Sequence, residues 1–204
     1  MELSLTQENQ RFSGPQKAKL FAEKRLRREK MNNNFFSRDA EQVARELLGK
    51  ILVRNVNGKE LKARIVETEA YYDEKDPASR ACKNGDLRET MKMDAGTILV
   101  YGVHNNWLIN FVTGKEGKAE AVLLRAVEPL NFSVKCNGPG LLTKALQINK
   151  ELHKQSILDN DELFIIYEDK ETFEIVESNR IGVKKDLKKK LRFYIKGNKH
   201  VSRK

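Results

Sequence analysis

Acidic and aromatic side chains gather in one short stretch of the sequence, RIVETEAYYDEKDPAS, at residues 64–79. Seven of these sixteen residues are Asp, Glu or Tyr. A carboxylate held beside an aromatic ring in a cleft can act as a general base with a raised pKa, and a tyrosine can stack on a planar base. The same residues could instead form a solvent-facing strand whose acids pair with lysines, and the strand pattern alone favours that interpretation.

Strand geometry decides which of these side chains can act together. If residues 61–72 form a strand, alternation places Glu67, Glu69 and Tyr71 on one face and Thr68 on the other. Two acids and a tyrosine then line one surface of the sheet. Alternation does not choose between Glu67 and Glu69.

The elements around this strand predict an α+β fold, a single domain with a curved, mainly antiparallel β-sheet and peripheral helices. A helix with an apolar face is expected to have Ser37 as its N-cap and to stop at Gly49. Asn57-Gly58 is typical of a hairpin turn between two strands. The other strands are predicted at 50–56, 97–101, 107–113 and 121–127, at 163–167 paired with 172–176, and at 192–196, with a further helix at 141–146.

Composition indicates a globular chain with a heavily charged surface. Its 204 residues are 39% hydrophobic and 33% charged, which suits one domain with its own core. No apolar run approaches the roughly 18 residues needed to cross a membrane, and no signal peptide is recognised. We expect an unsecreted monomer with no membrane partner. Cys82 and Cys136 lie outside any metal-binding pattern, so no metal and no cofactor is expected.

Positive charge is concentrated at the two ends of the chain. Residues 1–34 hold 8 Lys or Arg against 4 Asp or Glu, residues 35–180 hold 21 against 24, and residues 181–204 hold 10 against 1. Basic ends suit nucleic acid, because Lys and Arg that meet phosphates release condensed counterions; a solubilising tail is the alternative. We divide the chain into a basic, marginally helical appendage at 1–34 and one domain at 35–204 with a basic C-terminal end.

Several motifs along residues 35–202 together resemble the alkyladenine DNA glycosylase family, also called the methylpurine DNA glycosylases. They are FFSRDAEQVARELLGKILVR (35–54), ARIVETEAYYDEKDPAS (63–79), GTILVYG (96–102), AVLLRAVEPL (121–130), NGPGLLTKAL (137–146), RIGV (180–183) and LRFYIKGNKHVS (191–202). One such motif would be weak, but their common order makes the match specific.

The resemblance implies a monofunctional enzyme of base excision repair that acts on double-stranded DNA. Members flip a damaged purine out of the duplex and hydrolyse its bond to deoxyribose, without a metal or a lysine Schiff base. The purines would be alkylated adenine, hypoxanthine or ethenoadenine. Such a protein is expected in the cytoplasm or nucleoid of a prokaryote, or in the nucleus of a eukaryote.

The resemblance also implies roles for single residues. Glu69, the second Glu of ETEAY, would activate the attacking water and stabilise the oxocarbenium-like sugar. Arg125 and the backbone carbonyl of Ile181 would help to hold that water, and Tyr71 would stack on the extruded base. Asn110 matches an asparagine at the pocket floor, whose amide would discriminate among purines.

Two positions depart from the family pattern. Arg80 stands where members usually have a histidine that binds the flipped base; a guanidinium is permanently charged and accepts no hydrogen bond. Arg80 would then disfavour a cationic purine or bind a phosphate. In GTILVYGVHNNWLIN, alignment on YG makes Tyr101 the wedge that fills the gap in the base stack. Alignment on an upstream tyrosine puts Tyr101 in the pocket and gives the wedge to His104 or Trp107. We favour the first alignment.

Two other classes of function are open at this stage. A metal-dependent nuclease would take its carboxylate ligands from Glu67, Glu69, Asp73 and Asp76, although their spacing is loose and no histidine accompanies them. A noncatalytic nucleic-acid binder would rely on the basic ends and leave the acidic strand on the solvent side.

Overall fold

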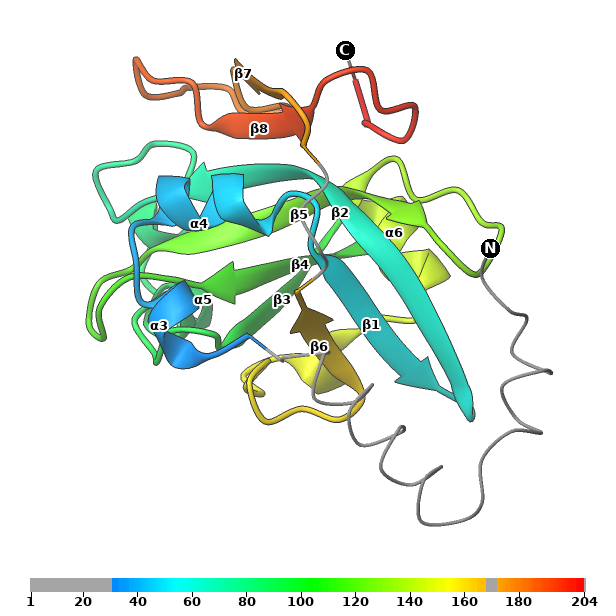
Figure 1. Ribbon diagram of the computed structural model, residues 1–204. Helices are drawn as coiled ribbons and strands as arrows, with labels where there is room; N and C mark the ends of the chain where they lie inside the picture. The colour runs from blue at the N-terminus through cyan, green and yellow to red at the C-terminus, as the bar shows by residue number, and fades with distance from the viewer. Residues whose placement is uncertain (1–30, 168–171, 204) are drawn as a thin grey trace, which may run out of the picture.

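The computed structural model describes residues 31–167 and 172–203 (Figure 1). These residues form one eight-stranded sheet in which every strand pairing is antiparallel, with short helices around it. The predicted α+β fold with a mainly antiparallel sheet is therefore confirmed. The predicted helical character of the N-terminal appendage falls outside the described residues. In the described part of the chain, no helix is both long and apolar enough to cross a bilayer.

The strands lie in the order β3-β4-β5-β2-β1-β6, while β8 pairs with β2 and β7 pairs with β8. Their bounds are β1 Ile51–Val56, β2 Lys59–Tyr71, β3 Ile98–Val103, β4 Asn106–Val112, β5 Ala121–Pro129, β6 Leu163–Ile166, β7 Ile175–Ser178 and β8 Arg192–Ile195. The longest strand is β2, with 13 residues, and it pairs with β1, β5 and β8. The acidic stretch is therefore held on both edges by neighbouring strands.

Short helices surround the sheet (Figure 1). They are α3 Asn33–Phe36, α4 Ala40–Leu47, α5 Asp86–Met91 and α6 Pro139–Ala145, with 3₁₀ helices η1 Arg80–Cys82 and η2 Lys150–Leu152. The apolar face of α4 packs on β2, where the Thr68 hydroxyl donates to the carbonyl of Ala44 at 2.7 Å. Because strand side chains alternate, Glu67 and Glu69 point away from α4.

Two tight hairpins shape the sheet. The β1–β2 turn lies at Asn57-Gly58 as predicted, with φ of 50° and 71°. The β3–β4 turn is His104-Asn105, with φ of 47° and 61°. This second turn was missed because neither residue is glycine, the residue that adopts positive φ most readily. Strands β3 and β4 consequently extend beyond their predicted limits.

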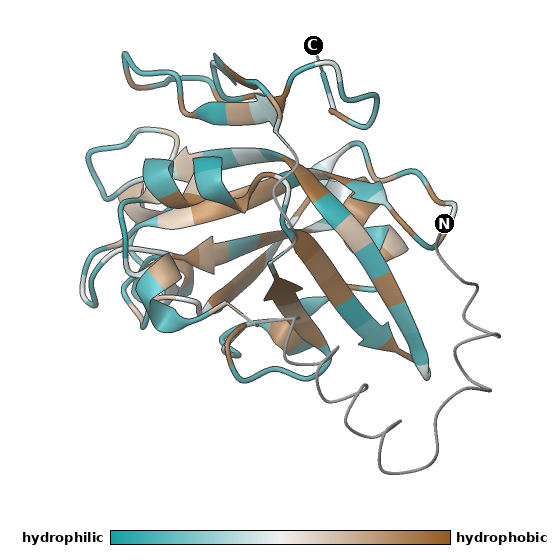
Figure 2. Cartoon of the chain, in the orientation of Figure 1, coloured by the Kyte–Doolittle hydropathy of each residue, from teal (hydrophilic) through white to brown (hydrophobic). Residues whose placement is uncertain are grey.

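The core fills the space between α4 and the sheet. Hydrophobic colour follows the central strands, and hydrophilic colour follows the loops and much of α4 (Figure 2). Phe36, Phe111 and Phe193 are among its largest fully buried side chains, and the rings of Phe36 and Phe111 lie 5.8 Å apart. Close-packed interiors resist deformation, so the sheet gives the opposite face a rigid support.

Two local predictions are wrong. The N-cap of α4 is Asp39, whose carboxylate accepts from the N–H of Glu41 at 2.9 Å, whereas Ser37 ends α3. The 163–167 and 172–176 segments do not pair: β6 joins β1, and β7 joins β8. Nearness in sequence favoured a hairpin, but each strand instead completes a separate edge of the sheet. The predicted stop at Gly49 is confirmed, since its φ is 82° and α4 ends at Leu47.

Candidate active site

A cleft of about 1110 Å³ opens on the face of the sheet that carries Glu69. Its walls come from η1 and α5, the β3–β4 hairpin, β5, the start of α6 and the segment around 181–185. The predicted site residues that line it are Tyr71, Arg80, Tyr101, His104, Asn110, Arg125 and Ile181. Glu69 is fully buried behind the lining residues that contact it. The structure thus brings residues from distant parts of the sequence to one place.

Strand register accounts for much of this convergence. Glu69 of β2 lies opposite Leu123 of β5, and Leu123 lies opposite Asn110 of β4. Directly opposed residues share a face, so Glu69 and Asn110 point to the same side of the sheet. The β2–β5 pairing is irregular on both sides of Glu67, where Arg125 lies on the partner strand. Such irregularities redirect side chains, and here Arg125 reaches both acids of β2.

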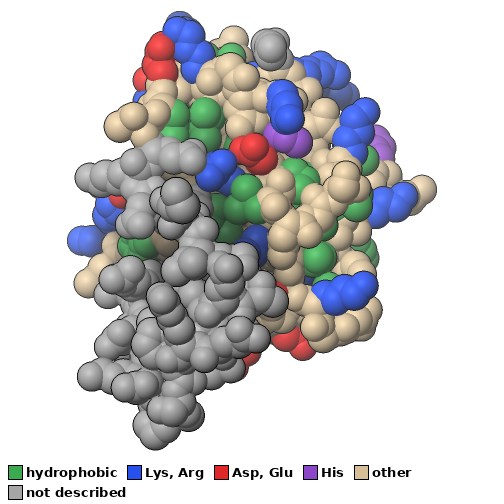
Figure 3. All heavy atoms as spheres, turned by 45° about the vertical axis from the view of Figure 1, so that its right-hand side comes forward, with side chains coloured by type: hydrophobic (Ala, Val, Ile, Leu, Met, Phe, Trp, Pro, Cys, Tyr) green, Lys and Arg blue, Asp and Glu red, His purple; other side chains and the backbone are tan. Residues whose placement is uncertain are grey.

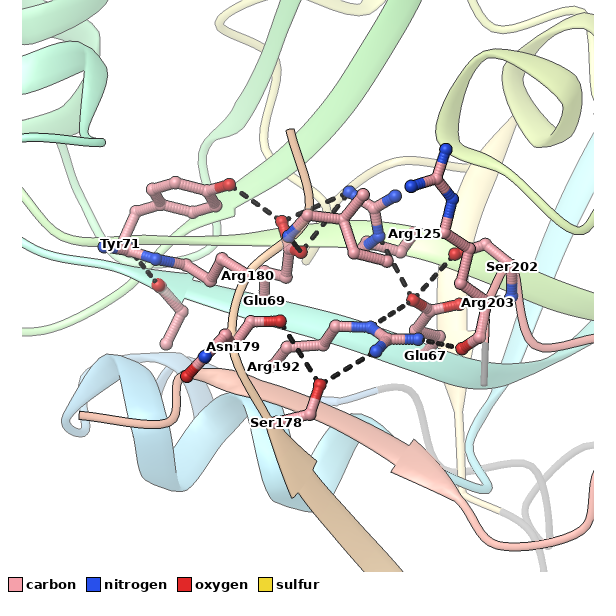
Figure 4. A network of polar contacts seen from close by, with 12 residues as sticks. Glu67, Glu69, Tyr71, Arg125, Ser178, Asn179, Arg180, Arg192, Ser202 and Arg203 are labelled. Carbon is pink, nitrogen blue, oxygen red and sulfur yellow. Dashed lines mark hydrogen bonds and ion pairs between the residues drawn. The ribbon is translucent and has the colours of Figure 1, made fainter. Parts of the chain in front are cut away.

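The Glu69 carboxylate receives three donors (Figure 4). The Tyr71 hydroxyl donates to Oε2 at 2.7 Å, the N–H of Ile181 donates to Oε1 at 2.7 Å, and Nη1 of Arg125 lies 3.3 Å from both oxygens. A carboxylate offers about four lone-pair sites, so one remains for a further donor such as water. The N–H contact of Ile181 was not anticipated, and the role of its carbonyl stays a prediction.

Burial raises the pKa of Glu69 above its ordinary value of 4.5, although Arg125, the Ile181 N–H and the Tyr71 hydroxyl act in the opposite direction. The pKa of Tyr71 is raised well above 10.0, first by burial and then by the adjacent Glu69 carboxylate. Tyr71 therefore keeps its proton and remains a donor at neutral pH. A carboxylate whose pKa is raised toward the working pH is a more effective general base.

A second fully buried carboxylate, Glu67, lies beside Glu69 (Figure 4). Arg125 bridges the two acids, since its Nε donates to Glu67 Oε1 at 3.1 Å while its Nη1 contacts Glu69. Arg192 of β8 donates to the same Glu67 oxygen at 2.7 Å. Ser202 adds its N–H at 2.6 Å to Oε2 and its hydroxyl at 2.8 Å to Oε1. Two carboxylates and two guanidinium groups thus balance one another inside the protein.

Arg180 joins the two loops that flank Glu69. Its guanidinium donates twice to Asp76, at 2.6 and 2.7 Å, twice to Asp186, and once to the carbonyl of Ala70. The side chains of Arg180 and Asp76 are fully buried. The guanidinium also lies 4.5 Å from the centroid of the Tyr71 ring. Arg180 therefore supports one donor to Glu69 directly, and it precedes the residue that provides another.

These contacts bear on the nuclease hypothesis. Glu67 and Glu69 face Arg125 and Arg192, whereas Asp76 faces Arg180, so the acids are already paired with cations. Within residues 31–167 and 172–203, no three side chains of the metal-binding types form a group able to hold an ion. The carboxylates of the acidic stretch therefore do not converge as that hypothesis requires.

Two tyrosines of the cleft each carry an arginine on one ring face. Arg180 covers one face of Tyr71, and Arg80 lies 4.8 Å from the ring centroid of Tyr101. Tyr101 belongs to the cleft wall, and the hairpin tip two residues beyond Gly102 is His104. Because Tyr101 and His104 both line the cleft, their placement does not decide between the two alignments, and the identity of the wedge stays a prediction.

The other hairpin residues fall on two faces. Asn110 is buried, and its Nδ2 donates to the carbonyl of Leu99 at 3.2 Å, which leaves its side-chain oxygen available as an acceptor. Trp107 is half-exposed and lies against Gly102, its opposite residue in β3. Trp107 is absent from the cleft wall, because it alternates with Asn106 and Leu108, which do line it.

Charge around the cleft is mainly positive. The cationic side chains that line it are those of Arg80, Lys83, Arg125, Lys184 and Lys185. The lining acid Asp86 is bound by Lys154 and contacts His153 at 3.0 Å. On the face drawn in Figure 3, Lys and Arg side chains occupy much of the periphery. Such a surface attracts a polyanion.

Three residues of the polar network could not be recognised from the sequence: Arg180, Arg192 and Ser202. All three lie in the family-like motifs at 180–183 and 191–202, but nothing in their spacing indicates that they would reach β2. The structure brings them there because β8 pairs with β2 and the chain end folds back over Glu67.

Comparison with known proteins gives this arrangement a context. A family model described as methylpurine-DNA glycosylase (MPG) matches residues 34–199. The chain belongs to the methylpurine-DNA glycosylase family. A relative from Aeropyrum pernix is 40% identical over 177 residues, covering 83% of this chain and 91% of its own. One from Borrelia garinii is 41% identical over 187 residues, covering 85% of this chain and all of its own. Both carry the name "Putative 3-methyladenine DNA glycosylase".

Membership of the methylpurine-DNA glycosylase family fixes the class of function. A DNA glycosylase is a hydrolase that breaks the N-glycosidic bond between a base and deoxyribose, and its substrate is DNA. The family match includes every predicted site residue, from Glu69 to Ile181. The glycosylase hypothesis is therefore favoured over the nuclease and the noncatalytic binder.

Proposed function

We propose that this protein is a monofunctional DNA glycosylase of base excision repair. It flips a damaged purine out of double-stranded DNA and hydrolyses the N-glycosidic bond with a water activated by Glu69. The observation that carries the proposal is the position of the buried Glu69 carboxylate. Three donors hold it next to a cleft whose lining is mainly cationic. A carboxylate held in this way suits the role of a general base that takes a proton from one water.

The chemistry follows from the carboxylate and its donors. Water donates a hydrogen bond to the free lone pair of Glu69, its oxygen forms a bond to the anomeric carbon, and its proton passes to Glu69. The carbon–nitrogen bond breaks, and its electron pair leaves with the purine. The ionised Glu69 stabilises the oxocarbenium-like sugar while that bond breaks. An alkylated, cationic purine leaves without further help, whereas a neutral lesion needs a proton on its ring.

The cleft supplies contacts for an extruded purine. The ring face of Tyr71 that Arg180 leaves uncovered can stack on the base, and the Asn110 oxygen can accept from a ring N–H or amino group. In this proposal His104, at the tip of the β3–β4 hairpin, fills the vacated position in the duplex, and Tyr101 is the alternative. Extrusion costs a few kcal/mol, less for a damaged or mispaired base, which contributes to selectivity.

The proposal is tested with duplexes that carry hypoxanthine, ethenoadenine or methylated adenine. Protein and duplex are incubated with a chelator, and the strand is then cleaved with alkali. We expect free base and alkali-dependent strand breaks from at least one lesion duplex and none from undamaged DNA. Strand breaks before alkali would indicate lyase or nuclease chemistry, and tight duplex binding without base release would indicate a noncatalytic binder.

The pH dependence of base release is a first prediction. Because the base form of Glu69 is the ionised one and burial raises its pKa above 4.5, activity should be low in acid and rise with pH. The single-turnover rate should reach a plateau by about neutral pH, with a midpoint above the ordinary range of glutamate. Rates measured on an excess of protein over duplex check this. A rate that falls as pH rises through that range would contradict the assignment.

Arg80 gives a second prediction, on lesion preference. Its guanidinium forms no ion pair within the described residues and stacks on Tyr101 at the cleft wall. A cationic purine about 5 Å away would be repelled by roughly 1 kcal/mol or more. Arg80→Gln should therefore raise the rate on a cationic methylpurine relative to hypoxanthine about fivefold to tenfold. Lys115→Ala, which removes an exposed charge that does not line the cleft, should leave that ratio unchanged.

A further inference from the structure

Glu67, the neighbour of the proposed base, accepts four hydrogen bonds, one more than Glu69. We infer that Glu67 is a positioning residue: it holds Arg125 at a fixed place between two carboxylates, so that Arg125 meets Glu69 from a constant direction. The inference rests on the proposed function, in which Glu69 activates water. It assigns to Glu67, and to the chain end that holds it, a part in the chemistry.

Glu67 cannot itself act as the base. Like Glu69, it is fully buried and does not itself line the cleft. Its Oε1 accepts from Arg125, Arg192 and the Ser202 hydroxyl, while Oε2 accepts from the Ser202 N–H. Arg192 and Ser202 do not line the cleft, whereas all three donors to Glu69 do, so it is Glu69 and not Glu67 that lies next to the cleft.

The way in which Arg125 is held points to positioning. Its Nε is directed to Glu67 at 3.1 Å, so the inner part of the guanidinium is anchored there, and the outer Nη1 lies 3.3 Å from both oxygens of Glu69. An arginine side chain is otherwise flexible and loses much rotamer freedom when ordered. Glu67 fixes this side chain in the protein before a substrate arrives.

Charge balance gives a second reason. Glu67 and Glu69 face two cations, Arg125 and Arg192. If Glu67 were neutral, Arg125 would act on Glu69 alone, and the repulsion between the two acids, which also raises the pKa of Glu69, would vanish. The pKa of Glu69 should then fall. Removal of the neighbouring charge thus changes the proposed base and not only the fold.

Glu67 is in turn fixed by the C-terminal end. Ser202 donates twice to it, and Arg192 contacts both Glu67 and the backbone carbonyl of Arg203 (Figure 4). Arg192 also donates to the hydroxyl of Ser178 in β7 at 2.8 Å. The basic chain end, expected to add either affinity for DNA or solubility, therefore also contacts the carboxylate next to the proposed base.

The test compares Glu67→Gln with Glu67→Asp, which shortens the side chain but restores the charge. In Glu67→Gln we expect the single-turnover plateau to fall about tenfold to a hundredfold, as for a misplaced catalytic group, with duplex affinity unchanged. The acid limb of the pH profile should also move to lower pH. Glu67→Asp should recover the position of the acid limb and part of the rate. Loss of activity without a shift of the acid limb would overturn the inference.

A spectroscopic readout does not depend on activity. The side-chain carboxyl ¹³C resonance of Glu69, assigned by its loss in Glu69→Gln, reports the pKa of this group. We expect that pKa to fall in Glu67→Gln and to stay in place in Glu128→Gln, which removes a half-buried carboxylate of β5 that pairs with Arg64 and Asn198. An unchanged Glu69 titration in folded Glu67→Gln would overturn the inference. If the wild type releases no base, the proposed function fails, and the titration still decides whether Glu67 controls the carboxylate.

Ser202→Ala provides a test that does not depend on whether the Glu67 variants fold. It removes one hydroxyl donor at a partly exposed position and leaves the N–H contact. We expect the melting temperature to fall by only a few degrees and the plateau rate by about twofold to fivefold, because one hydrogen bond to a charged group is lost one step from Arg125. Full activity in this variant would count against a role for the chain end.

Discussion

Glu69→Gln should lower the single-turnover rate of base release by about a thousandfold, within the range of roughly 10² to 10⁴ expected for loss of a general base. The amide has nearly the same shape as the carboxylate but cannot take up the proton of water. It also withdraws the negative charge that would stabilise the oxocarbenium-like sugar. Single-turnover assays on the duplex that the wild type prefers provide the measurement.

Controls separate loss of chemistry from loss of structure. Glu69→Gln should keep its affinity for the lesion duplex and melt close to the wild type, because the Gln oxygen can still accept from Tyr71 or from the N–H of Ile181. Glu69→Asp shortens the side chain by one methylene and should lower the single-turnover rate by about a hundredfold relative to the wild type. Glu128→Gln should be as active as the wild type. Near-normal rates in Glu69→Gln would remove Glu69 from the mechanism.

Strand alternation was enough to place the acids. It predicted that Glu67, Glu69 and Tyr71 share a face, and their common contacts with one another and with Arg125 confirm it. It could not rank the two acids, because both are fully buried on the same face. What separates them is their donors: those of Glu69 all line the cleft, whereas most of those of Glu67 do not.

Residues that act across long sequence distances were beyond a local pattern. Arg180 reaches Asp76 and Arg192 reaches Glu67, at separations of 104 and 125 residues. A pattern that repeats every two or four residues carries no information on such pairs. The pairing of β8 with β2, which brings them together, also escaped prediction, because β8 is only four residues long.

Turn chemistry explains the difference between the two hairpins. Asn57-Gly58 is recognised because it contains the residue that tolerates positive φ best, and its strands were predicted closely. His104-Asn105 adopts the same backbone region without a glycine; His and Asn do so more often than other non-glycine residues, but still uncommonly. The cost of that conformation is met by the pairing of β3 and β4 through six residue pairs. The candidate wedge thus stands on a turn that only the folded sheet specifies.

Arg180→Met should lower the free energy of unfolding by about 3–5 kcal/mol, the usual cost of removing one partner from a buried ion pair. Asp76 would remain buried without its cation, and Tyr71 would lose the guanidinium on its ring. Urea unfolding followed by circular dichroism measures the change. Base release should fall as well, since the segment that carries Ile181 loses its attachment to Asp76.

The surface supplies a matched control. Arg38 pairs with Glu46 through two hydrogen bonds of 2.9 Å, as Arg180 pairs with Asp76, but here both side chains are partly exposed, at 30% and 46%. Arg38→Met should therefore cost less than about 1 kcal/mol. A similar loss in the free energy of unfolding for the two variants would show that burial does not increase the contribution of the Arg180–Asp76 pair to stability.

Acidification should reduce the difference in the free energy of unfolding between the wild type and Arg180→Met. Burial alone would raise the pKa of Asp76, but Arg180 and two backbone N–H groups hold it below its ordinary 3.8. In the wild type this carboxylate therefore stabilises the fold above that pH and loses its contribution as pH falls through the lowered pKa. In Arg180→Met the effect of burial on the pKa of Asp76 is no longer opposed by the guanidinium, so that pKa is raised. Protonation of Asp76 then removes an unpaired buried charge, and the variant loses less free energy of unfolding than the wild type as the pH falls. A difference in stability that grows on acidification would contradict this account of the pair.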